Sequence, residues 1–218
     1  MLLMTNEIIL QGVVVEDCVL NEKIKGELIY STKLEVPRLS DRSDVLIIRI
    51  SNRFTAFKDI KVGTKLRVVG SIRTRNVSVE GQEQRRLEVT VFCDSVEIMS
   101  DEDYKPENTV RLQGTFRKES CLRKAKTCDR SVCEQLICSE RKYNKRSYVP
   151  TVFWGRTAEY AATLPQGTEV YCEGRLQSRK YIKRLKDGED KDIERRVTYE
   201  FVASSVELMN DEAEGAET

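Results

Sequence analysis

Aromatic and cationic side chains alternate with apolar ones in the stretch from Tyr148 to Tyr181. The segment YVPTVFW has the period of a β-strand, so Tyr148 and Trp154 share one face while Val149 and Phe153 share the other. One face can fill a core and the other can present rings. Flat rings beside guanidinium groups can stack on bases while the cations neutralise phosphates. The stretch therefore predicts a surface that binds unpaired nucleic-acid bases.

A dense charged run, RKYIKRLKDGEDKDIERR, follows this stretch and segregates its charges. The cations come first and the acids gather around Gly188. The cations are Arg179, Lys180, Lys183, Arg184 and Lys186. Two interpretations stay open: a basic arm that flanks a strand-binding groove, or a solvated hairpin, the usual meaning of dense mixed charge.

An internal repeat organises the whole chain. NEIILQG at 6–12 matches NTVRLQG at 108–114, and KVGTKLRVVG at 61–70 matches PQGTEVYCEG at 165–174. RRLEVTVFCDSVEIM at 85–99 matches RRVTYEFVASSVELM at 195–209, and Leu34 matches Leu136. A self-similar chain of this length predicts two copies of one domain.

Each copy contains about five strand-like runs and a short segment between the third and fourth that suits one or two helical turns. This is the layout of an OB-fold barrel. We therefore predict an all-β protein of two tandem five-stranded OB-fold barrels, each with a short helix between strands 3 and 4. The expected divisions are a first barrel at 1–100, a linker at 101–107, a second barrel at 108–209 and an acidic tail at 210–218.

The net charge of +1 conceals a gradient along the chain. Counting Lys and Arg against Asp and Glu, residues 1–107 carry −2, residues 108–209 carry +7 and residues 210–218 carry −4. Positive charge attracts the nucleic-acid backbone. The gradient assigns nucleic-acid binding to the second copy.

Other functional classes find little support in the sequence. There is no histidine, no phosphate-binding Gly-rich loop and no nucleophile motif, so we expect no enzyme. The four clustered cysteines, at 121, 128, 133 and 138, lack CxxC spacing, so we expect reduced thiols, no metal site and no cofactor. No apolar run approaches the roughly 18 residues of a membrane span, and no signal peptide is evident, which predicts a cytoplasmic protein that does not contact membranes.

The second copy resembles the bacterial single-stranded DNA-binding proteins and the related primosomal replication protein N. Four segments carry the resemblance in order: VRLQG, VPTVFWGRTAE, QGTEVYCEGRLQSRKY and RRVTYEFVASSVELM. In that family bases stack on aromatic residues after the second strand, at both ends of the third and just past the fourth. Those places correspond here to Tyr143, Tyr148, Trp154 and Tyr181.

The resulting candidate site combines stacking rings with phosphate-binding cations. Its members are Tyr143, Tyr148, Trp154, Arg156, Arg175, Arg179, Lys180, Tyr181, Lys183 and Arg184. In the first copy, a constant offset of 104 places Ile50, Asp44 and Val77 where Trp154, Tyr148 and Tyr181 stand. The first barrel is therefore expected to lack the stacking platform and to serve structure or assembly.

The resemblance implies sequence-independent binding of single-stranded DNA in replication, recombination or repair, chiefly by the second barrel. Relatives assemble four OB domains, so a tandem chain is expected to form a homodimer. The acidic tail lacks the hydrophobic tip through which such proteins recruit partners, which puts recruitment of replication or repair proteins in doubt. The alternative is an OB-fold protein scaffold or primosome assembly factor that binds nucleic acid weakly, because a fold does not fix a function.

Overall fold

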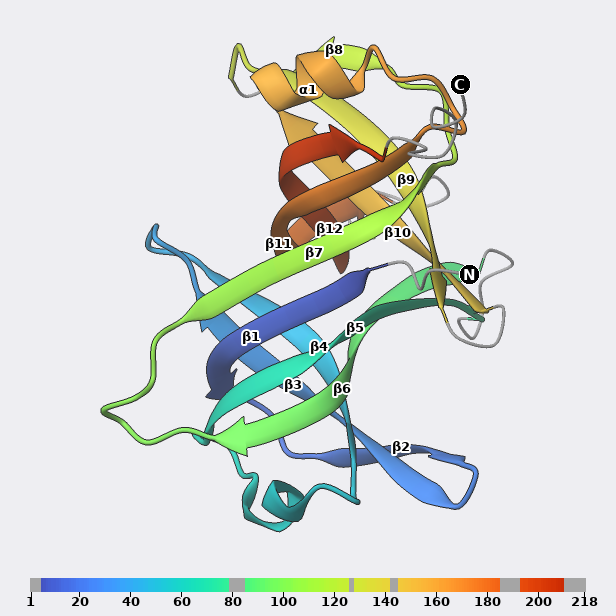
Figure 1. The fold of residues 1–218 in the computed structure, drawn as a ribbon. Helices are drawn as coiled ribbons and strands as arrows, with labels where there is room; N and C mark the ends of the chain where they lie inside the picture. Colours follow the sequence, from blue (N-terminus) through green and yellow to red (C-terminus); the bar gives the residue numbers. More distant parts are fainter. Residues whose placement is uncertain (1–4, 79–84, 126–127, 142–144, 185–192, 210–218) are drawn as a thin grey trace, which may run out of the picture.

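Two β-barrels stand one above the other in the computed structural model (Figure 1). The structure describes residues 5–78, 85–125, 128–141, 145–184 and 193–209, with the side chains of 182–184 and 193–195 outside the description. The first barrel contains β1 (Asn6–Val14), β2 (Val19–Ile24), β3 (Glu27–Pro37), β4 (Ser43–Ser51), the 3-10 turn η1 (Thr55–Asp59), β5 (Lys65–Val77) and β6 (Arg86–Ile98). The second contains β7 (Glu107–Phe116), β8 (Leu122–Lys124), β9 (Ser131–Arg141), β10 (Lys145–Trp154), helix α1 (Arg156–Ala161), β11 (Glu169–Arg184) and β12 (Ile193–Leu208).

Each barrel closes through the same five strands. In the first, β1 pairs with β5 and β3, β5 with β6, β6 with β4 in parallel, and β4 with β3. In the second, β7, β11, β12, β10 and β9 close the same ring. The predicted all-β architecture of two five-stranded barrels, with a short helical segment between the third and fourth ring strands, is confirmed. Each barrel also has a strand outside the ring, β2 or β8, which the sequence analysis did not predict.

Alternating apolar side chains fill the barrels. In β10 Val149 and Phe153 are fully buried, and Phe153 packs with Phe116, their ring centroids 5.9 Å apart. In β4 the alternate residues Leu46, Ile48 and Ile50 are fully buried. The predicted parity of β10, with Phe153 inward and Trp154 on the other face, is confirmed.

A bulge at a glycine lets one long strand serve two neighbours in each barrel. The register of β5 with β6 shifts between Val69 and Gly70, and that of β11 with β12 shifts between Glu173 and Gly174. A Cβ at Gly174 would collide with the carbonyl oxygen of Val202, and one at Gly70 with that of Phe92. The glycine that ends both repeat segments is therefore required by close backbone approach.

The bulge also fixes how the two copies align. Gly70 pairs with Cys93 in the first barrel, and Gly174 pairs with Ala203 in the second. One residue earlier in β6 and β12, Phe92 pairs in parallel with Arg49, and Val202 pairs in parallel with Val152. The counterpart of Trp154 is therefore Ser51, and that of Phe153 is Ile50. The sequence alignment at an offset of 104 was wrong by one residue in this strand, because the nearly all-apolar VLIIRI does not fix its own register. The same shift pairs Leu34 with Ile137, both buried, in place of Leu136.

The barrels join edge to edge through β1 and β7, which run antiparallel from Asn6 opposite Leu112 to Gln11 opposite Glu107 (Figure 1). Beyond this junction, each barrel reaches across to the other. The N–H of Tyr148 donates to the Thr74 hydroxyl at 2.8 Å. In the matching contact, the N–H of Val45 donates to the Ser178 hydroxyl at 3.0 Å. The sheet is therefore continuous over both barrels, and the contacts follow an approximate two-fold relation. Over the part of the chain that the structure describes, no helix is long and apolar enough to cross a membrane.

Candidate nucleic-acid interface

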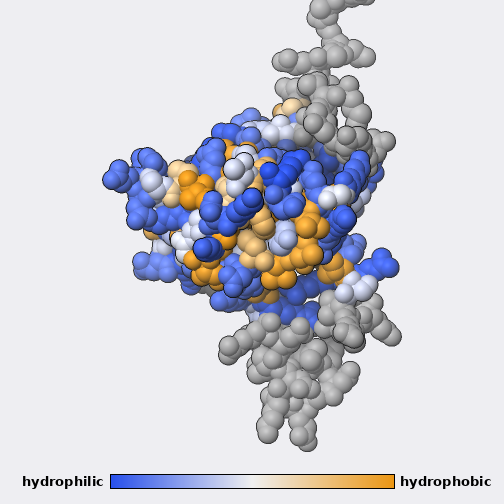
Figure 2. All heavy atoms as spheres, turned by 90° about the horizontal axis from the view of Figure 1, so that it is seen from below, coloured by the Kyte–Doolittle hydropathy of each residue, from blue (hydrophilic) through white to orange (hydrophobic). Residues whose placement is uncertain are grey.

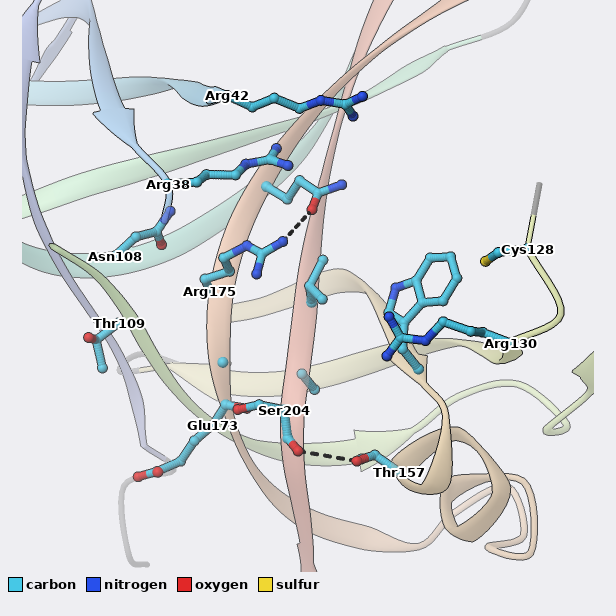
Figure 3. A pocket seen from close by; sticks show the side chains of 15 residues that line it. Arg38, Arg42, Asn108, Thr109, Cys128, Arg130, Thr157, Glu173, Arg175 and Ser204 are labelled. Carbon is cyan, nitrogen blue, oxygen red and sulfur yellow. Dashed lines mark hydrogen bonds between the residues drawn. The ribbon is translucent and has the colours of Figure 1, made fainter. Parts of the chain in front are cut away.

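A groove of about 870 Å³ runs over the outer face of β10, β12 and β11, beside the β3–β4 loop of the first barrel. We call it the Trp154 groove. The side chains that decide its chemistry are Trp154, Arg38, Arg42, Arg130 and Arg175. Figure 3 shows Arg38, Arg42 and Arg175 on one side of it and Arg130 on the other. One large ring and four guanidinium groups thus meet in one open hollow.

The position of Trp154 is set by the end of strand β10. It is the last residue of β10, partly buried, directly after the fully buried Phe153. Gly155 then takes a φ of +60°, which turns the chain into α1. The guanidinium carbon of Arg130 lies 5.9 Å from the ring centroid of Trp154. A partly exposed indole that lines the groove can stack on a base, and the adjacent guanidinium can donate hydrogen bonds to the phosphate of that nucleotide.

Alternation along β11 divides the predicted cations between its faces. Leu176 points into the barrel, so Arg175, Arg179 and Tyr181 share the outer face with Gln177, whereas Lys180 lies on the opposite face. Arg175 donates to the Gln177 amide oxygen at 2.9 Å. Arg179 forms an ion pair of 2.7 Å with Glu200, and Tyr181 is 38% exposed. Arg175 and Gln177 line the Trp154 groove, and Arg179 and Tyr181 follow them on the same face of β11.

The other predicted residues lie away from the groove or outside the described residues. Tyr148 shares the outer face of β10 with Trp154 but stands six residues earlier, about 20 Å away along the strand, at the junction with the first barrel. Arg156 is exposed at the start of α1 and does not line the groove. Tyr143 lies outside the described residues, as do the side chains of Lys183 and Arg184, whose backbone ends β11.

Three groove arginines were not singled out from the sequence: Arg38, Arg42 and Arg130. Arg38 and Arg42 belong to the first barrel, in the segment PRLSDR. Both nitrogens of the Arg38 fork donate to Asp44, at 2.8 and 2.5 Å. No sequence signal could have found them, because their role depends on how one barrel lies against the other.

Asp44 fixes that arrangement. Its carboxylate is only 1% exposed and also accepts the backbone N–H of Ser178, on β11, at 2.8 Å. Arg38 in turn donates to the Ser178 carbonyl at 3.3 Å. A buried carboxylate with three donors holds its partner in one geometry. The Asp44 cluster thus positions a first-barrel guanidinium against the second-barrel groove.

The cysteines divide by exposure. Cys121 and Cys128 are exposed, and Cys128 lines the Trp154 groove. Cys133 and Cys138 are buried in β9, and desolvation raises the pKa of the Cys133 thiol. Among the described residues, no three Cys, Asp or Glu side chains are grouped as a metal site requires.

Comparisons with known proteins agree with the fold. The model of the Single-strand binding protein family matches residues 107–209. The wild-type single-stranded DNA binding protein from Thermus aquaticus superposes with a TM-score of 0.77 at 16% identity, over 99% of this chain and 98% of that chain. A deletion mutant of the same protein gives 0.76 at 17% identity, over the whole of both chains. The tandem arrangement of the two barrels is therefore a known fold.

A third solved structure is similar over one domain only. It is described as the dimeric N-terminal domain of PriB from Thermoanaerobacter tencongensis, with 33% identity over 44% of this chain and 98% of that chain, and a TM-score of 0.37. No curated protein sequence matches this chain. Residues 107–209, which form the second barrel, are thus similar to the single-strand binding protein family.

Proposed function

We propose that this chain binds single-stranded DNA with little sequence preference, through the Trp154 groove, in DNA replication, recombination or repair. The observation that carries this proposal is that one partly exposed indole and four arginines from both barrels line the same open groove. Every base has a face on which an indole can stack, so rings give affinity without sequence readout. The arginines bind the phosphate backbone of the DNA, and this electrostatic part of the affinity falls as the salt concentration rises.

The groove also selects against duplex DNA. A paired base exposes no free face, so duplex can use the cations but not the ring. An anisotropy titration with oligo-dT, the matching duplex and the RNA equivalent separates these contributions. We expect oligo-dT to bind at least about tenfold tighter than duplex, an advantage of about 1.4 kcal/mol. Equal and weak binding to both would leave only charge attraction and favour the protein-scaffold alternative.

We also propose that two chains associate into a homodimer with four OB domains. Support comes from apolar side chains exposed on the outlying strand β2, namely Val19, Leu20 and Ile24. Figure 2 shows hydrophobic residues exposed among hydrophilic ones at the first-barrel end of the molecule. Light scattering at micromolar concentration should give twice the mass of the 25.1 kDa chain. A monomer would remove this proposal and leave DNA binding intact.

A further inference from the structure

The first barrel has an outer face equivalent to that of the Trp154 groove, and it encloses a cavity of about 200 Å³. We call it the Phe92 groove. Its cationic lining consists of Arg49, Arg73, Arg75, Arg141 and Lys145. Arg141 and Lys145 come from the second barrel, at the places where Arg38 and Arg42 stand in the first. Each groove is therefore completed by two cations from the other barrel.

The aromatic face in this groove is already covered. The guanidinium carbon of Arg73 lies 3.3 Å from the ring centroid of Phe92, in stacking contact. Phe92 corresponds to Val202 of the second barrel and Arg73 to Gln177. The first barrel thus has a ring of its own on β6, and one of its own side chains lies where a base would stack.

The cations are held in a similar way. Glu22 and Glu88 each bind Arg49 at 2.6 Å, and Glu88 also binds Arg75 at 2.6 Å. Glu22 is on the outlying strand β2, opposite Ile29, and its second-barrel counterpart is Arg123, opposite Val132. Glu88 has Thr198 as its counterpart. Both carboxylates are therefore particular to the first barrel.

Even so, the groove holds more positive than negative charge. Five cations line it, against Glu22, Glu88 and the nearby Asp94. Burial and the charge of Arg141 lower the pKa of Arg73 to about 10. Within the described residues, the Nε atoms of Arg49, Arg73 and Arg141 are buried without a hydrogen-bond partner. Buried donors and surplus cations together favour a further anion.

We propose that the Phe92 groove is a second site for single-stranded DNA, held shut by Glu22 and Glu88. Backbone phosphates compete with the two carboxylates for Arg49 and Arg75, and a base competes with Arg73 for the ring of Phe92. This inference rests on the proposed function of the Trp154 groove, because a strand held there is delivered to the first barrel at high effective concentration. Short strands bind in the Trp154 groove alone. Long strands also open the Phe92 groove, at the free-energy cost of displacing Glu22 and Glu88 from their arginines.

The test compares strands that reach one groove or both. An OB fold covers about 4–16 nucleotides, so oligo-dT of about 10 nucleotides fills one groove and about 35 spans two. The variant is Glu22→Gln with Glu88→Gln, which keeps an amide oxygen for Arg49 but removes the competing charge. We expect its affinity for the long strand to rise about tenfold, with a salt slope steeper by about 0.7 for each phosphate gained, and short-strand affinity to change less than about twofold.

Two controls locate the effect. Glu97→Gln with Asp101→Asn removes the same charge from two ion-paired surface acids outside the groove. It should leave the long-strand affinity within about twofold of the parent protein. Adding Arg141→Gln and Lys145→Gln to the Glu22/Glu88 variant should abolish the gain.

Specific results of these titrations would contradict the inference. An unchanged long-strand affinity, with thermal unfolding showing an intact fold, would mean that the groove is closed for good. A gain of equal size for the short strand, or in the Glu97/Asp101 control, would mean general charge attraction. If Glu88→Gln prevents folding, Glu22→Gln alone, on a side chain 33% exposed, should still give a gain of several-fold. Failure of the short strand to quench Trp154 in every variant would instead refute the proposed function.

Discussion

Trp154 is the single tryptophan of the chain, so its emission reports directly on the groove. We predict that oligo-dT quenches this emission and that Trp154→Ala weakens binding by about 1–3 kcal/mol, the usual loss for a stacked base. The variant should remain folded because the ring already lies partly in solvent. Tyr160→Ala is the matched control, since Tyr160 is 43% exposed on α1 and does not line the groove. Equal losses in the two variants would contradict a specific stacking role.

Two cysteines offer a second test at this scale. Cys121 and Cys128 are both exposed, but only Cys128 lines the Trp154 groove. We predict that oligo-dT slows alkylation of Cys128 by iodoacetamide several-fold and leaves Cys121 unchanged, as followed by mass spectrometry of the peptides. Cys172 should react slowly in either state, because burial raises the pKa of its thiol to about 12 and little thiolate forms. Protection of both exposed cysteines would point to a global change in place of a local footprint.

Sequence reasoning at the residue scale worked where alternation determines the outcome. The opposite faces of Phe153 and Trp154 follow from strand parity, and the structure has them so. The same logic places Arg175 and Tyr181 on one side of β11, but it also removes Lys180 from that side. Phe92 was not identified as a ring on the binding face, because its counterpart Val202 gives no aromatic match in the repeat.

At the scale of elements, the glycine bulge in β11 gives the clearest testable prediction. Gly174→Ala would force a Cβ into the backbone carbonyl of Val202, which belongs to a paired strand and cannot rotate away. We predict a loss of about 2–3 kcal/mol in the free energy of unfolding, within the range for overpacking. Gly26→Ala is the comparison, because Gly26 has a φ of +92° but open space around it, and the strain of a left-handed conformation alone costs about 1–2 kcal/mol. Denaturant unfolding that ranked Gly26→Ala as the more damaging would contradict the role given to the bulge.

The ring strands were predictable and the outlying strands were not. Ring strands such as β1 and β5 place an apolar residue or a glycine at every second position along most of their length, and this period predicts both the strand and its inward face. Strand β2 is almost wholly exposed and β8 has three residues, so neither has a buried face that would produce an alternating hydrophobic pattern in the sequence. β2 nevertheless carries Glu22, the residue that closes the Phe92 groove.

At the scale of the whole molecule, charge counted by segment was a poor guide to the groove. Residues 1–107 carry a net charge of −2, yet they supply Arg38 and Arg42 to the Trp154 groove. The edge-to-edge pairing of β1 with β7 and the contact of Asp44 with Ser178 bring these arginines there. Such placement depends on contacts between residues more than 130 positions apart, which no local pattern encodes.

The contribution of the first barrel to DNA binding is measurable through Arg42, which is exposed in the groove wall. We predict that Arg42→Gln lowers the slope of log K against log salt by about 0.7 for oligo-dT of about 10 nucleotides, the value for one lost phosphate contact on a single strand. Arg38 is less suitable, because its loss would leave the buried Asp44 carboxylate without a cation, and breaking such a pair costs about 3–5 kcal/mol of stability. Arg53→Gln is the control: it removes an equal charge from the same barrel, at an ion pair with Glu27 that does not line the groove. A slope that stays the same in Arg42→Gln, or falls equally in Arg53→Gln, would mean that the strand binds to the second barrel alone and that the first acts only as its support.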